Sequence, residues 1–454
     1  MDRIVIVGAG PVGSLLALTL ARRGYEIDVY ERRLDMRRVE QGAGRSINLA
    51  VSTRGLYALH AVGLDQEVLA SAVPMLGRSM HSASGARTFL RYGKDDSEFI
   101  NSMSRGELNK LLMTEAERTG RVRIHFERKL TAYDPRASLL TFDSGPEVRA
   151  PIVIGSDGSA SALRASFPSG RVSREVLPSG YKELTMPPLP GGGFAMEKSA
   201  LHIWPRGSFM LIALPNRDGS FTCTLFLAFA GTPSFAGLQD SASVRQFFER
   251  EFPDALALIP GLADQFLAAP LGQMVTIKAQ PWAYGGALLI GDSAHAIVPF
   301  FGQGMNAGFE DVTLLEATLG PGPSPRVGAR PIDPLPEVFE RFAAARKPDT
   351  DAIADLAVEN FVEMQDKVSD PVFLRHKAIE AQLQQRFPGE YISRYQLVTF
   401  TRVPYRVALR AGQIQQGIFT ELGEGEIDYE RARRLIRERL VPLLAQHGLA
   451  GAVE

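Results

Sequence analysis

The sequence predicts an α/β protein in which a Rossmann-like nucleotide-binding domain is interleaved with an antiparallel-sheet domain and followed by a helical C-terminal region. Three observations lead to this prediction. A strand, a glycine-rich turn, a helix and a second strand follow one another at the start of the chain. Residues 199–230 contain alternating and aromatic-rich stretches that are typical of antiparallel strands. After residues 320–336, a proline-rich segment that we expect to be an exposed loop, the pattern is mostly helical.

The composition is that of a globular, enzyme-sized protein. Its 454 residues are 45% hydrophobic and 22% charged, and the formal net charge of −1 gives no reason to expect a nucleic-acid partner. The single cysteine, Cys223, excludes an intrachain disulfide and a cysteine-built metal site. No signal-peptide pattern follows Met1, and no apolar stretch reaches the roughly 18 residues of a membrane span. We therefore expect a soluble, cytoplasmic protein.

The first elements of the chain form a βαβ unit. Ile4–Val7 is a β-branched run bounded by glycine, which predicts a strand buried on both faces. Pro11 suits the first turn of the leucine-rich helix that follows, and Gly24 suits its end. Ile27–Tyr30 is the second strand.

A GxGxxG turn made of Gly8, Gly10 and Gly13 joins the first strand to its helix, and Glu31 closes the second strand. The glycines allow a tight turn, close approach of a pyrophosphate and close packing of the helix on the strand. The carboxylate at the end of the second strand can accept hydrogen bonds from a ribose. The motif therefore predicts a dinucleotide site, and by itself it leaves FAD and NAD both open.

Two later motifs decide between these cofactors. Asp157 follows an apolar run in residues 152–164 (IVIGSDGSASALR), and Asp292 does the same in residues 289–311 (LIGDSAHAIVPFFGQGMNAGFED). With the first motif, this ordered trio resembles the FAD-dependent aromatic monooxygenases of the para-hydroxybenzoate hydroxylase type. The resemblance implies that the middle motif touches FAD, that Asp292 binds the ribityl hydroxyls and that residues 299–306 lie along the isoalloxazine ring.

The glycine-rich backbone of residues 289–311 would leave space for the flavin ring. A helix that starts near Gly304 would aim its N–H groups at the pyrimidine side of the flavin, where the reduced ring carries negative charge. Side chains at the glycine positions would hold the ring away. We expect His295, which lies within this motif, to support the loop rather than to act as a catalytic base.

A closer resemblance covers nearly the whole chain. Eight stretches are similar to the kynurenine 3-monooxygenase family: GRSINLA (44–50), YGKDDSE (92–98), GYKEL (180–184), LHIWP (201–205), IALPN (212–216), VPFFGQGMNAGFED (298–311), ENFVEM (359–364) and RYQLVTF (394–400). Members of that family use NADPH and O2 to hydroxylate L-kynurenine to 3-hydroxy-L-kynurenine through a flavin C4a-hydroperoxide. The resemblance implies this reaction, with non-covalent FAD as the cofactor and no side chain acting as the catalyst. No second GxGxxG domain is present, so we expect NADPH to bind in a surface groove.

The resemblance also implies the site residues. Arg78, Tyr92 and Tyr395 are expected to bind the substrate carboxylate, because an arginine fork between two phenols matches that group. The other expected substrate-binding residues are Asn360, Met364, Leu201, Ile212, Leu214, Phe226, Phe300 and Phe301. The expected cofactor-binding residues are Gly8, Gly10, Gly13, Glu31, Arg32, Arg33, Ala50, Arg105, Leu130, Asp157, Asp292, Gly304, Met305 and Asn306. No metal is expected, since the histidines show no ligand spacing.

These motifs predict the domain organisation. Residues 1–70, 100–180 and 275–319 are assigned to the FAD-binding domain, and residues 71–99 and 181–274 to a substrate-binding sheet domain. Residues 337–454 are expected to form a helical region that completes the substrate pocket.

The chain departs from parts of the family, and other functions remain open. Some bacterial members have histidine where this chain has Phe301, and membrane-bound eukaryotic members end in a hydrophobic anchor. Residues 428–448 are charged and amphipathic, so we expect no membrane anchor. The alternatives are an FAD-dependent hydroxylase of another aromatic substrate, a flavin-dependent halogenase and a non-catalytic flavin-binding protein. A halogenase typically needs two tryptophans flanking one residue, whereas Trp204 and Trp282 lie far apart.

Overall fold

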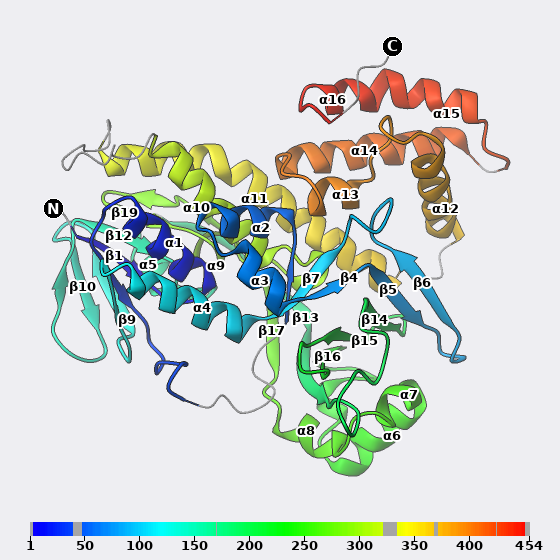
Figure 1. Cartoon of the computed structure of the whole chain (residues 1–454), viewed down its shortest axis with the longest axis horizontal. Coiled ribbons are helices and arrows are strands. Elements are labelled where there is room, and N and C mark those ends of the chain that lie inside the picture. The colour runs from blue at the N-terminus through cyan, green and yellow to red at the C-terminus, as the bar shows by residue number, and fades with distance from the viewer. Residues whose placement is uncertain are drawn as a thin grey trace.

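A computed structural model describes residues 3–39, 48–168, 170–320, 334–366, 371–423 and 425–449, without the side chains at positions 362, 364–366, 371, 373 and 374. Three regions are visible in Figure 1: a parallel sheet with its helices, an antiparallel sheet backed by short helices, and a group of C-terminal helices. This confirms the predicted fold class. No helix in the described ranges is long and apolar enough to cross a membrane.

The parallel sheet carries the predicted βαβ unit. Its six strands lie in the order β18-β19-β12-β1-β2-β8, and only β18 runs antiparallel to its neighbour. The strands are β1 (Ile4–Val7), β2 (Ile27–Tyr30), β8 (Val122–His125), β12 (Ile152–Gly155), β18 (Ala283–Tyr284) and β19 (Ala287–Leu289). Every residue of β1, β2 and β12 is buried, as expected of strands covered on both faces.

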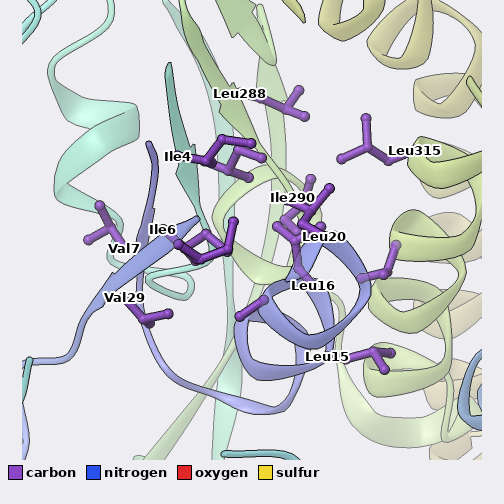
Figure 2. Packing of buried hydrophobic residues seen from close by; sticks show 14 of the residues in the cluster. Ile4, Ile6, Val7, Leu15, Leu16, Leu20, Val29, Leu288, Ile290 and Leu315 are labelled. Carbon is purple, nitrogen blue, oxygen red and sulfur yellow. The ribbon is translucent and has the colours of Figure 1, made fainter. Parts of the chain in front are cut away.

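Helix α1 (Pro11–Arg22) packs between this sheet and two further helices, α4 (Arg105–Arg118) and α10 (Gly304–Thr318). In Figure 2, the side chains of Ile4 and Ile6 from β1 lie beside Leu16 and Leu20 from α1. On its other side, α1 can approach α10 closely because Gly308 of α10 has no side chain. A Cβ there would lie 2.6 Å from a Val12 methyl group.

The second sheet has seven strands in the order β17-β13-β16-β15-β14-β5-β6. They are β5 (Gly77–His81), β6 (Arg87–Arg91), β13 (Arg171–Met186), β14 (Ala200–Pro205), β15 (Met210–Pro215), β16 (Phe221–Ala228) and β17 (Gly272–Gln280). All neighbours are antiparallel except β14 and β5. One face of the sheet packs on α6 (Ser241–Glu251), α7 (Pro253–Leu256) and α8 (Leu262–Ala268), and alternate residues therefore point to the opposite face.

A buried polar chain lies behind this sheet. The Nδ1 atom of His81 is 3.0 Å from a carboxylate oxygen of Asp254, and its Nε2 atom is 2.9 Å from Nδ1 of His202. The Nε2 atom of His202 then donates to the carbonyl of Glu197 at 2.8 Å. Burial lowers the pKa of His202 to about 4, so that this imidazole is neutral in the folded protein at neutral pH.

Two smaller sheets and several short helices complete this part of the chain. Two three-stranded sheets consist of β3 (Asn48–Val51), β7 (Ile100–Ser104) and β4 (Val73–Met75), and of β11 (Val148–Arg149), β10 (Leu139–Phe142) and β9 (Leu130–Asp134). The remaining helices of this part are α2 (Thr53–Ala61), α3 (Asp65–Ser71), α5 (Ala162–Ala165), η1 (Phe235–Gly237), α9 (Asp292–His295) and η2 (Pro299–Phe301).

The C-terminal helices begin with α11 (Leu335–Asp366), which runs along the parallel-sheet region toward the antiparallel sheet in Figure 1. It is followed by α12 (Pro371–Arg386), α13 (Arg394–Thr399), α14 (Tyr405–Leu422), α15 (Tyr429–Leu435), the π-helical turn η3 (Ile436–Leu440) and α16 (Val441–Ala445). Buried side chains from these helices form one apolar cluster with residues of the antiparallel sheet and of η2, whereas Val338, Phe339 and Phe342 at the start of α11 belong to the core of the parallel-sheet region.

The structure adds detail to three sequence expectations. The predicted domain boundaries at 180/181 and 274/275 fall inside β13 and β17, which run without a break from one region into the other. Residues 321–333 of the predicted proline-rich loop lie outside the described residues. Residues 335 and 336, the end of that predicted loop, are instead the start of α11. A proline is compatible with this position, because the first turn of a helix needs no backbone N–H donor there.

Candidate active site

A cavity of about 310 Å³ lies where the parallel sheet, the seven-stranded sheet and α10 meet. Gly10 and Asp292 line it from the parallel-sheet region, Gly304 from α10, and Tyr395 and Thr399 from α13. A volume of this order suits a small-molecule site, whose usual range begins at about 300 Å³.

The apolar wall of the cavity is the face of the seven-stranded sheet that points away from α6–α8. Its lining residues occur at every second position along the strands: Arg78 in β5; Leu201 and Ile203 in β14; Met210, Ile212 and Leu214 in β15; Thr224 and Phe226 in β16. The intervening residues, such as Trp204 and Cys223, belong to the core against α6–α8. The period of two in the strands therefore separates the cavity from the core.

Arg78 lies at one corner of this wall, beside a stacked pair of tyrosine rings. The guanidinium carbon is 5.2 Å from the ring centre of Tyr92 and 5.0 Å from that of Tyr395, and the two rings are stacked at 5.6 Å. The Nε atom of Arg78 is buried without a hydrogen-bond partner among the described residues, and so is the hydroxyl of Tyr92. Within the same residues, no carboxylate lies within ion-pair distance of Arg78.

Burial raises the pKa of both tyrosines, so their phenols stay protonated. The corner therefore offers one cation and two neutral hydroxyl groups to a ligand. Because a desolvated cation is costly without an opposite charge, the corner is suited to an anionic group such as a carboxylate.

The N-terminal end of α1 forms a second part of the site. Gly10 precedes the helix and lines the cavity, and a Cβ placed on it would meet no chain atom within 4 Å. A Cβ on Gly13 would instead lie 2.0 Å from the carbonyl oxygen of Gly8. The two glycines thus act differently: Gly13 allows the helix to pack on the turn, and Gly10 leaves space in front of the helix for a phosphate group.

Glu31 fixes the shape of this turn. Its carboxylate accepts hydrogen bonds from the backbone N–H of Ala9 at 2.9 Å and of Arg33 at 3.0 Å. Each carboxylate oxygen keeps a second lone pair, so Glu31 can still accept a hydrogen bond from a ribose.

The second and third sequence motifs meet next to this turn. One carboxylate oxygen of Asp157 accepts from the backbone N–H of Ala162 and of Leu163, at 2.8 and 3.3 Å, and so caps α5. Arg164 of α5 donates to the carbonyl of Ser293 at 2.7 Å and thereby holds the start of α9. Asp292, beside Ser293, is exposed and lines the cavity, which leaves its carboxylate accessible to hydroxyl groups of a cofactor.

The N-terminal end of α10 closes the site. Gly302, Gln303, Gly304 and Met305 line the cavity where the helix begins. Gly302 has a left-handed backbone, with φ at +65°, that favours glycine. The helix places its partial positive charge at this wall.

These features fit a flavin dinucleotide, and comparisons with known proteins give the family. Residues 2–321 match the model of the FAD binding domain family. The chain is 53% identical to a kynurenine 3-monooxygenase of Myxococcus xanthus (strain DK1622), over 98% of this chain and 97% of the relative. The chain belongs to the kynurenine 3-monooxygenase family. A relative of the same name in Xanthomonas oryzae pv. oryzae (strain KACC10331 / KXO85) is 45% identical, over 98% of both chains. The cofactor of this flavoprotein monooxygenase is therefore FAD.

Solved structures support the fold. The tetrameric form of 2-methyl-3-hydroxypyridine-5-carboxylic acid oxygenase superposes with a TM-score of 0.64 at 18% identity, over 91% of this chain and 98% of that one. PqsL of P. aeruginosa, in complex with 2-aminobenzoylacetate, gives a TM-score of 0.65 at 19% identity, over 81% of this chain and 97% of that one.

The structure brings most of the family's expected site residues to the cavity. Those that line it are Arg78, Tyr92, Tyr395, Leu201, Ile212, Leu214, Phe226, Phe300, Phe301, Gly10, Ala50, Arg105, Asp292, Gly304 and Met305. Those that do not line it are Gly8, Gly13, Glu31, Arg32, Arg33, Leu130, Asp157, Asn306 and Asn360. The side chain of Met364 lies outside the described residues, although its backbone belongs to α11.

Two of the residues behind the wall support residues within it. Asn306 donates to the carbonyls of Ala50 and Gly302, at 2.8 and 2.9 Å, and accepts from the backbone N–H of Ser52 at 3.0 Å. Asn360 of α11 donates to the carbonyl of Phe300 at 2.7 Å. Both amides therefore hold cavity-lining residues in place from outside the cavity.

A buried charge network, which was not predicted from the sequence, lies beneath α10. Arg346 of α11 donates to Asp311 at 2.8 Å and pairs with Glu310 at 2.8 Å, and Glu310 also pairs with Arg54 of α2. Asp311 in turn accepts from the backbone N–H of Gly291 at 2.8 Å and contacts His295 at 2.5 Å. This agrees with the expectation that His295 supports the loop.

The network extends to the cavity through one further residue. The guanidinium of Arg54 lies 3.9 Å from the ring centre of Tyr405, whose hydroxyl donates to the side chain of Gln303 at 2.9 Å. No local sequence signal could have indicated this arrangement, because Arg54 and Glu310 are 256 residues apart in the chain. Only the letters GFED, which end the glycine-rich motif, contain the two acids.

Proposed function

We propose that this protein hydroxylates L-kynurenine to 3-hydroxy-L-kynurenine with NADPH and O2. The observation that carries this proposal is the corner at Arg78. A partly buried guanidinium beside two stacked tyrosine rings, without a carboxylate partner in the described residues, suits the carboxylate of an amino acid. The names of the 53% and 45% identical relatives support the choice of amino acid.

The bound substrate would extend from Arg78 along the apolar wall of the cavity. Arg78 would form the forked contact to the carboxylate, with the phenols of Tyr92 and Tyr395 as further donors. The aromatic ring would lie over Leu214 and Ile212, beside Phe226. We assign Asn360 a supporting role through the carbonyl of Phe300, since its amide is engaged there.

FAD, when bound, takes electrons from NADPH and transfers one oxygen atom of O2 to the ring. The turn of Gly8, Gly10 and Gly13 would hold its diphosphate, and Asp292 its ribityl hydroxyls. The start of α10 would stabilise negative charge on the reduced ring. Phe300 and Phe301, which line the cavity beside the apolar wall, would exclude water from the reacting atoms.

The domain assignment made from the sequence fits this arrangement as a proposal. Cofactor residues come from the parallel-sheet region, whereas the substrate wall comes from the seven-stranded sheet. The C-terminal region contributes Tyr395 and Thr399, so it completes the substrate pocket.

The test is NADPH oxidation by purified, FAD-loaded protein, measured with and without L-kynurenine, with the product identified by mass. We expect oxidation to accelerate with L-kynurenine and one oxygen atom to be added to it. Salicylate and para-hydroxybenzoate serve as controls for a hydroxylase of another aromatic acid. If either control accelerates NADPH oxidation and is itself hydroxylated, whereas L-kynurenine does neither, that aromatic acid is the substrate in place of L-kynurenine. No NADPH oxidation under any condition would indicate a non-catalytic flavoprotein.

A further inference from the structure

Thr224 is a polar residue on an otherwise apolar part of the cavity wall. It is fully buried within β16, it lines the cavity, and its hydroxyl has no hydrogen-bond partner among the described residues. A buried hydroxyl without a partner costs on the order of 1–3 kcal/mol. Its neighbours on the same face are Ile212 across β15 and Phe226 along β16. The apolar neighbours give no structural reason for a hydroxyl at this position, which suggests that it has a partner in the liganded protein.

Glu183 lies directly opposite Thr224. The register of β13 and β16 pairs the two residues, so their side chains point to the same face, with Cβ atoms about 5 Å apart. Among residues 179–186, which pair with β16, Glu183 is the only acid. Its carboxylate takes part in no hydrogen bond or ion pair in the described part of the chain. The carboxylate is therefore free to reach the Thr224 hydroxyl by rotation of its side chain, or through one water molecule.

The surroundings of Glu183 favour a proton acceptor at neutral pH. Burial raises its pKa to about 7, although the charge of Arg105 opposes that shift. Arg105, from α4, and Tyr181, from β13 itself, are the charged and titratable described groups that face it. Lys182 points to the other face of the sheet, where it donates to the carbonyl of Phe266. The strand β16 presents only neutral side chains to Glu183.

The position of Thr224 relative to Arg78 matches the length of the proposed substrate. Three strand spacings, about 14 Å, separate β5 from β16, and the register places Thr224 in line with Met80, two residues along β5 from Arg78, so the Arg78 and Thr224 backbones are about 16 Å apart. The Arg78 side chain covers part of that distance, and the remainder suits a short amino-acid chain followed by one aromatic ring. With its carboxylate on Arg78, the substrate would therefore place its ring next to Thr224.

Resting on the proposed function, we propose that Thr224 and Glu183 form a relay that accepts the proton lost by the aromatic ring during hydroxylation. A C–O bond forms at the ring carbon, and the C–H bond at that carbon then breaks, with its electron pair returning to the ring. The proton passes to the oxygen of Thr224 while the hydroxyl proton of Thr224 passes to the carboxylate of Glu183. O2 supplies the oxygen atom, and NADPH supplies the two electrons that reduce the second oxygen atom to water. Thr224 touches the substrate in this proposal, and Glu183 acts through it.

The experiment compares Thr224→Val and Glu183→Gln with the wild type in single-turnover formation of hydroxylated product from pH 5.5 to 8.5. Loss of a general base typically slows a reaction by 10²-fold or more, and we expect about 100-fold in either variant. The wild-type rate should rise with pH through about 7, where Glu183 loses its proton, and the Glu183→Gln rate should be flat there. Kynurenine deuterated at the hydroxylated carbon should show a larger isotope effect in both variants than in the wild type. Thr224→Ser, which keeps a hydroxyl, should recover most of the rate.

Glu175→Gln and Thr276→Val are matched controls, because they form an equivalent Glu–Thr pair on β13 and β17 away from the cavity. They should leave the rate and its pH dependence unchanged. FAD content and kynurenine affinity, measured for every variant, show that the fold and the site are intact. If the wild type hydroxylates kynurenine while both relay variants keep its rate, pH profile and isotope effect, the relay is wrong and the proposed function stands. If the wild type does not hydroxylate kynurenine, the proposed function itself fails.

Discussion

Replacing Arg78 with alanine should separate substrate binding from cofactor binding. This guanidinium lies about 5 Å from two stacked tyrosine rings and has no carboxylate partner among the described residues. A substrate carboxylate would supply the missing charge, and removal of one partner of such a contact costs about 2–5 kcal/mol. The dissociation constant of kynurenine should therefore rise by about 30-fold to several thousand-fold.

The stability of the free protein should respond in the opposite direction. Arg78 is partly buried and has no carboxylate partner among the described residues, so its removal takes away a desolvated cation and its contacts with two tyrosine rings but no ion pair. We expect the unfolding midpoint of the ligand-free Arg78→Ala protein to be unchanged or higher, as is common for residues that serve function at a cost in stability. Arg78→Lys should recover only part of the affinity, because an ammonium cannot reproduce the planar fork.

Titration of kynurenine, followed by flavin absorbance and by NADPH oxidation, measures this effect. Arg91→Ala is the matched control, since Arg91 lies on the adjacent strand β6 in an exposed pair with Asp96. Loss of an exposed pair costs at most about 1 kcal/mol, and this variant should bind kynurenine like the wild type. Equal kynurenine affinity in fully flavinated wild type and Arg78→Ala would remove Arg78 from the site and refute the proposed substrate contact.

Three further predictions concern the scaffold. Gly10→Ala should fold but lose FAD, because its Cβ meets no chain atom and faces the cavity. Gly13→Ala should instead lower the thermal midpoint, because its Cβ would lie 2.0 Å from the carbonyl of Gly8. Flavin absorbance per chain and circular dichroism distinguish the two variants. Arg346→Met should destabilise by about 3–5 kcal/mol in urea unfolding, since it leaves Glu310 and Asp311 buried without this partner, while Lys347→Met, which breaks a partly exposed pair, should cost under about 1 kcal/mol. The pKa of His202 is about 4 in the folded protein and near 6.5 in the unfolded chain. Because the unfolded chain therefore takes up this proton first, stability is lost as the pH falls from 6.5 toward 4. Between pH 7 and 4.5 the wild type should lose up to about 3 kcal/mol more than His202→Gln, and an equal loss in both would contradict the assignment.

Local sequence patterns were sufficient to predict the strands, the helices and the glycine-rich turn of the dinucleotide site. The β-branched run of β1, the glycines around it and Glu31 act over neighbouring residues, and so their spacing alone indicates a strand, a turn and a helix. Alternation in β14–β16 likewise predicted an antiparallel sheet, because side chains on a strand must point to opposite faces. The proposed carboxylate contacts, Arg78, Tyr92 and Tyr395, could not be assigned from local patterns, and their assignment rested on a family resemblance.

Contacts between distant segments were decided by the tertiary structure. Strand register places Glu183 opposite Thr224, and nothing in either segment specifies the other as its partner. The same holds for Arg54 and Glu310, whose pairing links α2 to α10 across most of the chain. The sequence by itself thus determined the strands, the helices and the dinucleotide turn, since these depend on local conformation and periodicity. The tertiary structure alone decided which buried charges pair and which polar groups face the cavity, because those contacts depend on packing between segments far apart in the chain.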